Sequence, residues 1–287
     1  MQSRETFDML VRRLTVTLEP DHGLAEARSL ALLVVRYVTR LSQAALLHDA
    51  HEPFPKELLP KVNNILRQLK KRIPVQYVLG ETEFYGCRIR VSPAVLIPRP
   101  ETEELVNELL HKAGKETVPF RILDVGTGSG CIAVALAKEL SKAEIYASDV
   151  SEESLQLARE NAKENRAKVH FFREDVLNPG HRTGVTYRYI VSNPPYVPES
   201  EKKIMQPEVV YHEPPGALFV PDDDPLLFYR AILEYAYNHM EKGGWVLVET
   251  HERFAERVKD LFEVYGMKEV EVKTDINGKE RFVGGRR

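Results

Sequence analysis

The hydrophobic positions of the chain follow one spacing near its start and another from about Arg121 onward. Between Ser3 and about Lys71, apolar residues recur at intervals of three and four, which is the spacing of one face of an amphipathic helix. Turn-forming residues at 21–23 and 51–55 divide this region into several helices. The pattern therefore predicts a small N-terminal helical bundle. One face of it should be formed by Leu30, Leu33, Val34, Tyr37, Val38 and Leu41.

The stretch after the predicted bundle has the features of a short linker that leads into a second domain. Residues 83–91 alternate in the manner of two short strands around Gly86, which predicts a β-hairpin. Pro100, followed by Glu101 and further acidic side chains, suits the first turn of a helix, where negative charge meets the positive end of the helix dipole. We expect a helical substrate-recognition domain, a hairpin linker and a larger catalytic domain. Their predicted boundaries are 1–71, 72–98 and 99–287.

Beyond residue 121, short apolar runs alternate with helical segments. Strands are expected at 122–125, 145–148, 169–172, 189–191 and 245–249, and helices at 131–140 and 252–264. Strands that alternate with helices predict a mostly parallel sheet with helices on both faces, as in Rossmann-like α/β domains. Two more strand-like runs, 269–273 and 280–283, flank Asn277-Gly278, which is a strong signal for a C-terminal antiparallel hairpin.

Composition and charge exclude several classes of protein. Of the 287 residues 43% are apolar and 29% are charged, as in an ordinary globular chain, and the net charge of −3 gives no reason to expect binding to duplex nucleic acid. Met1 to Leu10 lacks the apolar core of a signal peptide, and no apolar run approaches the ~20 residues of a membrane span. We expect a cytoplasmic protein without a membrane partner. Cys87 and Cys131 stand alone, so we expect neither a metal site nor a disulfide.

The most informative stretch is Ser192-Asn193-Pro194-Pro195-Tyr196, which follows the fourth expected strand. It should emerge at the carboxyl edge of the sheet, where open α/β sheets bind their ligands. Asn193 offers an amide oxygen, and the two prolines fix the backbone so that the Pro194 carbonyl points outward. These two acceptors suit the two hydrogens of a planar amino group, with Tyr196 as an aromatic wall beside it. The stretch predicts a site that acts on an –NH2 group.

A glycine-rich turn after the first expected strand predicts a bound nucleoside. Its glycines are Gly126, Gly128 and Gly130, a G-x-G-x-G spacing that differs from the G-x-G-x-x-G of dinucleotide sites because position 131 is Cys. Asp124, just before the turn, suits a cofactor with a positive charge at that point, such as the amino-acid end of S-adenosylmethionine, better than a pyrophosphate.

Two further aspartates support the same interpretation. Asp149 closes the second strand, where it is able to accept from both ribose hydroxyls, and Asp175 follows the third, where an adenine edge would lie. Because the carboxyl ends of parallel strands meet at one edge of a sheet, the three acidic side chains should surround one ligand. Any one of them alone is typical of a cap or a turn.

These motifs together resemble the PrmC (HemK) family of protein-(glutamine-N5) methyltransferases, which act on peptide chain release factors. The resemblance covers nearly the whole chain and is weakest over the first ~70 residues. It rests on residues 72–77, Arg-Ile-Pro-Val-Gln-Tyr; 96–103, Leu-Ile-Pro-Arg-Pro-Glu-Thr-Glu; 124–130, Asp-Val-Gly-Thr-Gly-Ser-Gly; and 192–196, Ser-Asn-Pro-Pro-Tyr. One departure is the acidic, proline-flanked stretch 220–225, where the family tends toward glycines.

The resemblance implies a class I methyltransferase fold, S-adenosylmethionine as cofactor with S-adenosylhomocysteine as product, no metal, and class 1 release factors as partners. The substrate is then the glutamine of a Gly-Gly-Gln loop, and its methylation modulates translation termination. The implied glutamine-binding and catalytic residues are Asn193, Pro194, Pro195 and Tyr196. The implied cofactor residues are Asp124, Val125, Gly126, Thr127, Gly128, Asp149, Asp175, Val176 and Asn193.

Three alternatives remain open at this point. A DNA adenine-N6 methyltransferase would hold an exocyclic amine in the same clamp, but the chain has no long basic target-recognition segment. A nicotinamide-dependent oxidoreductase is disfavoured by Cys131 at the position of the third glycine. A nucleoside-sensing module without enzymatic activity would leave residues 193–196 without a role.

Overall fold

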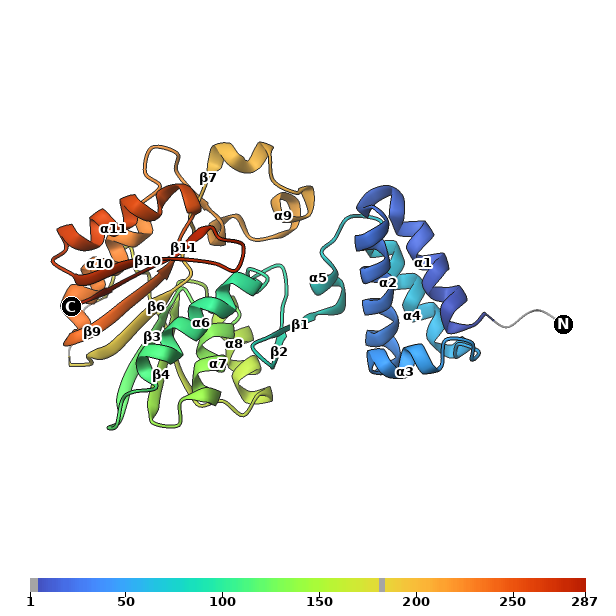
Figure 1. The fold of residues 1–287 in the computed structure, drawn as a ribbon, viewed down its shortest axis with the longest axis horizontal. Helices are drawn as coiled ribbons and strands as arrows, with labels where there is room; N and C mark the ends of the chain where they lie inside the picture. The colour runs from blue at the N-terminus through green and yellow to red at the C-terminus, as the bar shows by residue number, and fades with distance from the viewer. Residues whose placement is uncertain (1–4, 181–183) are drawn as a thin grey trace. The chain divides into compact units, whose positions relative to one another are not determined.

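The computed structural model describes residues 5–180 and 184–287, and the chain divides into two compact units (Figure 1). The first unit consists of residues up to Gly80 together with Pro207–His212, and the second of Glu81–Gln206 and Glu213–Arg287. The beginning of the predicted bundle, at Ser3, lies outside the described residues.

The first unit is helical, as predicted. Its core is formed by apolar side chains of the three longest helices. Leu33, however, is 38% exposed, so its expected place in the core was wrong. The buried stripe of the second helix instead includes Ala31 and Val35, because this face packs against both neighbouring helices. The helices are α1 (Phe7–His22), α2 (Leu24–Thr39), α3 (Gln43–His48), η1 (Lys56–Leu58), α4 (Leu59–Leu69) and α5 (Val75–Leu79).

A short helix from much later in the chain, α9 (Pro207–His212), completes the first unit. Arg72 connects it to the bundle, because its Nε donates to Glu208 Oε1 at 2.7 Å while its Nη1 donates to the Asp21 carbonyl at 3.0 Å. The Arg72 ion pair lowers the pKa of Glu208 against the opposing effect of burial, which is the largest single influence. Arg72 therefore has a structural role within this unit.

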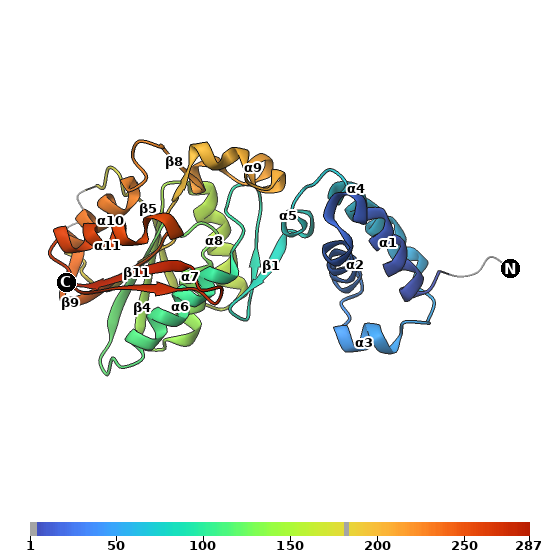
Figure 2. The same cartoon turned by 45° about the horizontal axis from the view of Figure 1, so that its top comes forward.

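The second unit is built on a seven-stranded sheet with the order β10-β11-β9-β6-β3-β4-β5 (Figures 1 and 2). The last five strands in this order are parallel, and β11 runs antiparallel to both of its neighbours. The predicted parallel sheet and C-terminal hairpin are confirmed. The strands are β3 (Phe120–Val125), β4 (Ala143–Asp149), β5 (Val169–Arg173), β6 (Tyr187–Ser192), β9 (Met240–Glu249), β10 (Lys268–Thr274) and β11 (Glu280–Arg286).

Helices cover both faces of this sheet, with α6, α7 and α8 side by side on one face and α10 and α11 on the other. These helices are α6 (Pro100–Ala113), α7 (Cys131–Glu139), α8 (Glu152–Glu164), α10 (Leu227–His239) and α11 (Ala255–Val264), which follows η4 (Glu252–Phe254). The expected helices at 131–140 and 252–264 are confirmed within a residue or two. Within the described residues, no helix has the length and apolarity needed to cross a membrane.

The predicted hairpin is present as β1 (Glu81–Phe84) and β2 (Cys87–Arg90), beginning two residues earlier than expected. The fully buried Asn161 of α8 holds it against the sheet domain. Its Oδ1 accepts from the Arg90 N–H at 2.7 Å, and its Nδ2 donates to the carbonyls of Arg90 and Ser129. One side chain thus ties the hairpin to the glycine-rich turn. Cys87 and Cys131 are both buried free thiols.

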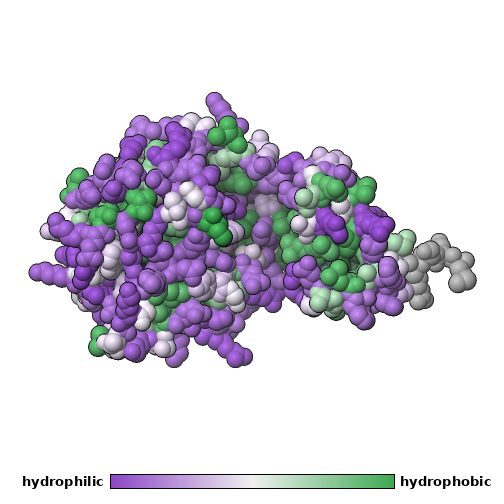
Figure 3. All heavy atoms as spheres, viewed as in Figure 1, coloured by the Kyte–Doolittle hydropathy of each residue, from purple (hydrophilic) through white to green (hydrophobic). Residues whose placement is uncertain are grey.

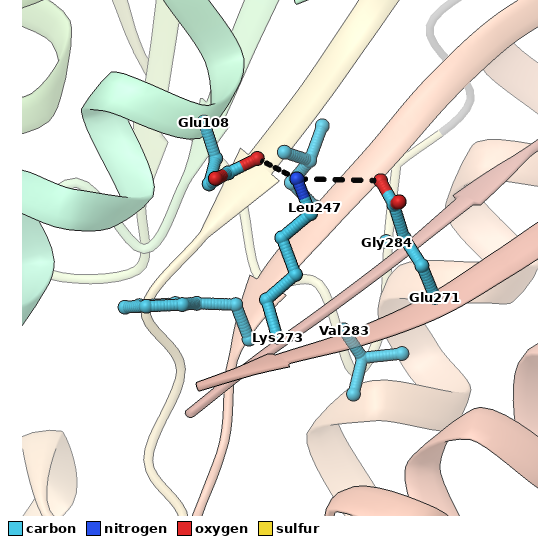
Figure 4. A pocket seen from close by; sticks show the side chains of 7 residues that line it. Glu108, Leu247, Glu271, Lys273, Val283 and Gly284 are labelled. Carbon is cyan, nitrogen blue, oxygen red and sulfur yellow. Dashed lines mark hydrogen bonds and ion pairs between the residues drawn. The ribbon is translucent and has the colours of Figure 1, made fainter. Parts of the chain in front are cut away.

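Ion pairs fasten α6 to the outer strand β10. Lys273 lies between Glu108 of α6 and Glu271 of its own strand (Figure 4), and Lys112 also bonds to Glu271. The hollow beside Lys273 measures only about 10 Å³, roughly the space for one water molecule, so it is a packing feature. The consequence for function is that α6, whose first turn carries Thr102, has a fixed position over the sheet.

The stretch 220–225, where the sequence departs from the family pattern, forms an ordered turn. It follows the short parallel pair β7 (Val197–Pro198) and β8 (Phe219–Val220). The Asp224 N–H donates to the Pro221 carbonyl at 3.1 Å, and the Asp222 carboxylate accepts from Ser200 Oγ at 2.7 Å. The short elements nearby are η2 (Glu199–Lys203) and η3 (Pro215–Ala217).

Candidate active site

A cavity of about 500 Å³ lies at the carboxyl ends of β3, β4, β5 and β6, the edge at which a doubly wound sheet binds its ligands. Ten of the twelve predicted site residues line it, and the side chains of Asp124 and Tyr196 lie behind its wall. The ten are Val125, Gly126, Thr127, Gly128, Asp149, Asp175, Val176, Asn193, Pro194 and Pro195.

Hydrogen bonds to β4 fix the conformation of the glycine-rich turn. The N–H groups of Gly126 and Thr127 both donate to the Ser148 carbonyl at 2.9 Å, and the Gly128 N–H donates to Asp149 Oδ2 at 2.9 Å. Gly128 has φ +53°, in the left-handed region that favours glycine. At Gly126 and Gly128 the turn presents bare backbone to the cavity, as a ligand that approaches closely requires.

Gly130, at the end of the turn, is required by packing. A Cβ atom at this position would lie 2.9 Å from the Ala158 Cβ of α8, and the backbone has φ +79°. The third glycine therefore serves close contact between the start of α7 and α8. The same function is given to the third glycine of dinucleotide sites, although the spacing here is shorter.

Asp124 is the most strongly perturbed carboxyl group near the cavity. It is fully buried; its Oδ2 accepts from Thr127 Oγ1 at 2.6 Å, and its Oδ1 has no partner among the described residues. Burial raises the pKa of Asp124 to about 7, against the opposing effect of the Thr127 hydrogen bond. A buried carboxylate oxygen without a donor is costly in the free protein and is satisfied by a ligand that brings a donor or a positive charge.

The other two aspartates are held by local backbone. Asp149 Oδ1 accepts from the Ser151 N–H at 2.9 Å, so each of its oxygens already has one donor and keeps one lone-pair direction for a ligand. Burial raises the pKa of Asp149, and its backbone hydrogen bonds act against this. Asp175 Oδ1 accepts from the Leu177 N–H at 2.9 Å, which fixes the turn that brings Val176 to the cavity.

The 192–196 stretch is fixed at both of its ends. Ser192 Oγ donates to the Val125 carbonyl at 2.7 Å, and the N–H groups of Tyr196 and Val197 both donate to the Leu218 carbonyl. Asn193 and the two prolines between these anchors face the cavity. The stretch is thus a rigid part of the cavity wall, next to the glycine-rich turn.

Behind this wall, Asn193 belongs to a line of side-chain hydrogen bonds. Its Nδ2 donates to Thr102 Oγ1 at 3.0 Å, the Thr102 hydroxyl donates to Glu249 Oε2 at 2.7 Å, and the Tyr196 hydroxyl donates to Glu249 Oε1 at 2.9 Å. Burial raises the pKa of Glu249, with both hydrogen bonds and the positive charge of Arg281 acting in the opposite direction. Burial also raises the pKa of Tyr196, so its hydroxyl stays neutral and is committed to Glu249.

Sequence reasoning missed two further parts of the site. Arg99, which reads as a capping residue, lines the cavity and pairs with the buried Glu213 at 2.5 Å. The second part is the pair Thr102 and Glu249, in which Thr102 accepts a hydrogen bond from the Asn193 amide and donates one to Glu249. A signal for Glu249 was present, because it ends a strand as Asp124 and Asp149 do, whereas no local pattern indicates the pairing of Arg99 with a residue 114 positions away.

The sheet order, the glycine-rich turn after β3 and the cavity at the strand ends define a class I methyltransferase, the S-adenosylmethionine-dependent α/β class. A solved methyltransferase from Pyrococcus furiosus shares this fold at 18% identity, with a TM-score of 0.51 over 70% of this chain and 89% of that one. The RsmC 16S rRNA methyltransferase of T. thermophilus, solved in complex with AdoMet and guanosine, also has a TM-score of 0.51, at 16% identity over 72% of this chain and 49% of that one.

Sequence comparison gives the particular family. Residues 9–80 match the PrmC N-terminal domain, and residues 102–219 match the methyltransferase small domain. The release factor glutamine methyltransferase of Bacteroides thetaiotaomicron is 44% identical over 79% of this chain and 81% of its own length. That of Koribacter versatilis is 41% identical over 100% of this chain and 99% of its own. The chain belongs to the PrmC (HemK) family of release factor glutamine methyltransferases.

Proposed function

We propose that this protein transfers a methyl group from S-adenosylmethionine to the side-chain amide nitrogen, N5, of the glutamine in the Gly-Gly-Gln loop of class 1 release factors, and so modulates translation termination. The observation that carries the proposal is the placement of Asn193. Its amide lines the same cavity as the glycine-rich turn, and its Nδ2 is engaged behind the wall by Thr102, which leaves its carbonyl oxygen for a ligand. Family membership makes a glutamine amide the ligand that fits.

The cofactor part of the proposal assigns a place to each end of S-adenosylmethionine. The turn from Val125 to Gly128, with the buried carboxyl group of Asp124 behind it, fits its positively charged amino-acid end. Asp149 fits the ribose hydroxyls, and the Asp175–Val176 turn fits the adenine. When bound, this cofactor supplies an electrophilic methyl group on a sulfonium, so the transfer needs no metal. S-adenosylhomocysteine is the product.

The substrate part of the proposal assigns the glutamine to the opposite wall. An amide nitrogen is a poor nucleophile because its lone pair is delocalised, so the chain must compensate by placement. The Asn193 side-chain oxygen and the Pro194 carbonyl accept the two amide hydrogens, while Pro195 limits where the amide plane lies. Tyr196, predicted from the sequence as an aromatic wall, does not line the cavity and instead supports this stretch through its hydroxyl bond to Glu249. Both acceptors favour the positive charge that grows on nitrogen as the new N–C bond forms. One proton leaves to water after the transfer, so no strong general base is needed.

We propose that the parts of the chain divide this work, with residues 1–71 as the substrate-recognition domain, 72–98 as a linker and 99–287 as the cofactor domain. Large apolar side chains are exposed on the first unit, and Figure 3 shows hydrophobic patches on its visible surface. Such patches commonly mark protein interaction surfaces. The expected partner is a release factor, and the expected compartment is the cytoplasm, where ribosomes terminate translation.

Product mapping tests the proposal. The protein is incubated with S-adenosylmethionine and an unmethylated release factor, and the factor is then digested and sequenced by mass spectrometry. One methyl group on the side chain of the Gly-Gly-Gln glutamine is expected. A methyl group on any other residue would contradict the assignment, and methylation of adenine in duplex DNA would favour the adenine-N6 alternative, which the same amino-group clamp allows.

A further inference from the structure

Residues from three elements meet beside the cavity, and the proposed reaction gives a role to only one of them, Asn193. Thr102 stands in the first turn of α6, Glu249 ends β9, and Asn193 follows β6. Glu249 is 1% exposed and does not line the cavity, whereas Thr102, 2% exposed, lies at its edge beside Asn193. Through their side chains, they are connected by hydrogen bonds to the Asn193 amide.

The direction of these hydrogen bonds follows from the number of protons available. In the structure both oxygens of Glu249 accept, one from the Thr102 hydroxyl and the other from the Tyr196 hydroxyl. A hydroxyl has a single proton, so once Thr102 donates it to Glu249, its oxygen is left as an acceptor toward Asn193. The Asn193 amide must then turn its NH2 toward Thr102 at 3.0 Å and its carbonyl oxygen the other way.

We propose that Thr102 and Glu249 are positioning residues that fix the orientation of the Asn193 amide, so that its oxygen and not its NH2 meets the substrate amide. The inference rests on the proposed function, because only an amino-group substrate needs an acceptor there. With the opposite orientation, two NH2 groups would face each other and the growing positive charge on the substrate nitrogen would lose a favourable partner.

A purely structural role would not call for this choice of residues. Burial of a carboxyl group costs free energy, and apolar side chains of similar volume fill such a space at lower cost. Arg281, whose positive charge influences Glu249, makes its own ion pair with Asp275 at 3.2 Å. Glu249 is therefore held as a buried acceptor whose partners are hydroxyl groups, which suits control of hydrogen-bond direction.

Four variants test the inference in methyl transfer to an intact release factor. Thr102→Val keeps the shape and removes the hydroxyl, Thr102→Ser restores it, and Glu249→Gln replaces one acceptor oxygen with a donor. Tyr229→Phe is the matched control, since its buried hydroxyl donates to the Glu249 backbone carbonyl at 3.2 Å and not to the carboxylate. For each variant, kcat, the KM for the factor and the Kd for S-adenosylhomocysteine are measured.

Deletion of a preorganised group costs about 10²–10³ in kcat. Because these variants only release the Asn193 amide to adopt either orientation, we expect a loss of roughly tenfold or more for Thr102→Val and Glu249→Gln. The KM and the cofactor Kd should stay within about twofold, because the residues proposed to contact the cofactor and the substrate are not substituted. Thr102→Ser should recover kcat to within about threefold, and Tyr229→Phe should keep it within about twofold.

The outcomes separate the inference from the function on which it rests. Near-normal kcat in Thr102→Val and Glu249→Gln, with the unaltered protein active on the factor, would overturn the inference alone. So would equal losses of kcat in Thr102→Val and Thr102→Ser, or a loss that appears only as a raised KM or a weakened cofactor Kd. Absence of methyl transfer by the unaltered protein would overturn the proposed function and this inference together.

Discussion

Asp124 is the last residue but one of β3, and Glu249 is the last residue of β9 in the same sheet. Both carboxyl groups are buried, but their hydrogen-bond partners differ. Asp124 has an oxygen without a donor, whereas both oxygens of Glu249 accept hydrogen bonds from side-chain hydroxyls. An unsatisfied buried acceptor is suited to a ligand, and a satisfied one fixes its neighbours. At the scale of single residues, these surroundings support the two proposed roles, Asp124 for the cofactor and Glu249 for the orientation of Asn193.

The residue-scale prediction for the substrate wall concerns Asn193→Ala. The substitution removes one of the two proposed acceptors and leaves the glycine-rich turn and Asp149 unchanged. We expect methyl transfer to fall by about 10²-fold or more, as for loss of a preorganised hydrogen-bonding group, while the cofactor Kd changes by less than about tenfold. Calorimetry with S-adenosylhomocysteine and a turnover assay measure the two effects. Near-normal turnover would contradict the assignment of Asn193.

A second prediction at the residue scale concerns how the free energy of unfolding depends on pH through Asp124. Burial raises the pKa of Asp124 to about 7, above the ~3.9 expected in the unfolded chain. The folded protein therefore binds the extra proton between these values, and this group makes the free energy of unfolding fall as pH rises from about 4 to about 7.

The Asp124→Asn variant has no carboxyl group to ionise at this position, so this contribution to the fall of its unfolding free energy with rising pH should be absent. Urea unfolding of the cofactor-free protein at about pH 5 and about pH 7.5 measures it, and the variant should gain stability relative to the unaltered protein at the higher pH. An equal difference between the two proteins at both pH values would show that the ionisation of Asp124 is not coupled to folding.

At the scale of elements, much of the architecture follows from local pattern. The strands, the α6 start at Pro100 and the Asn-Gly hairpin are predictable because apolar runs, first-turn charges and turn residues are local signals. The line from Asn193 through Thr102 to Glu249 is not, because it joins residues 91 and 147 positions apart that only the folded sheet brings together. Leu33 illustrates the same limit, since helical spacing alone does not give the centre of the buried face.

The element-scale prediction concerns the contact between α7 and α8. Gly130→Ala would place a Cβ 2.9 Å from the Ala158 Cβ and would strain a residue with φ +79°. Gly278→Ala is the matched control, because Gly278 has φ +77° but no described atom lies within 4 Å of the added Cβ. Overpacking costs about 1–3 kcal/mol, so we expect Gly130→Ala to lose about 2 kcal/mol more than the control in urea unfolding. Equal losses would show that the helices adjust without cost.

At the scale of the whole molecule, the chain forms two units, and the sequence predicts only in part which segments belong to each. The helical unit and the sheet unit are expected from the change in hydrophobic spacing near residue 121. The membership of α9 in the helical unit is not, because its contacts with the rest of that unit join distant parts of the chain, as in the bond between Arg72 and Glu208, which are 136 positions apart. Long-range ion pairs of this kind leave no local signal in a single sequence.

The prediction at this scale tests recognition by the helical unit. Val16 and Leu24 are 67% and 61% exposed, so a change to aspartate at both positions leaves the core intact. If this unit binds the release factor through its apolar surface, the double variant should raise the KM for the factor by roughly tenfold and leave the cofactor Kd unchanged. Val264→Asp, on the 80% exposed Val264 of α11, is the matched control. An unchanged KM in the double variant would place recognition elsewhere.

The central claim is that the cavity methylates one glutamine of a release factor. The most direct test is transfer of label from methyl-tritiated S-adenosylmethionine to three substrates side by side: a release factor with an intact Gly-Gly-Gln loop, its Gln→Asn variant, and unmethylated duplex DNA. We predict label on the intact factor alone, because asparagine is one methylene shorter than glutamine and its amide would not reach the Asn193 acceptor. Label on DNA, or equal label on both factor variants, would contradict the account.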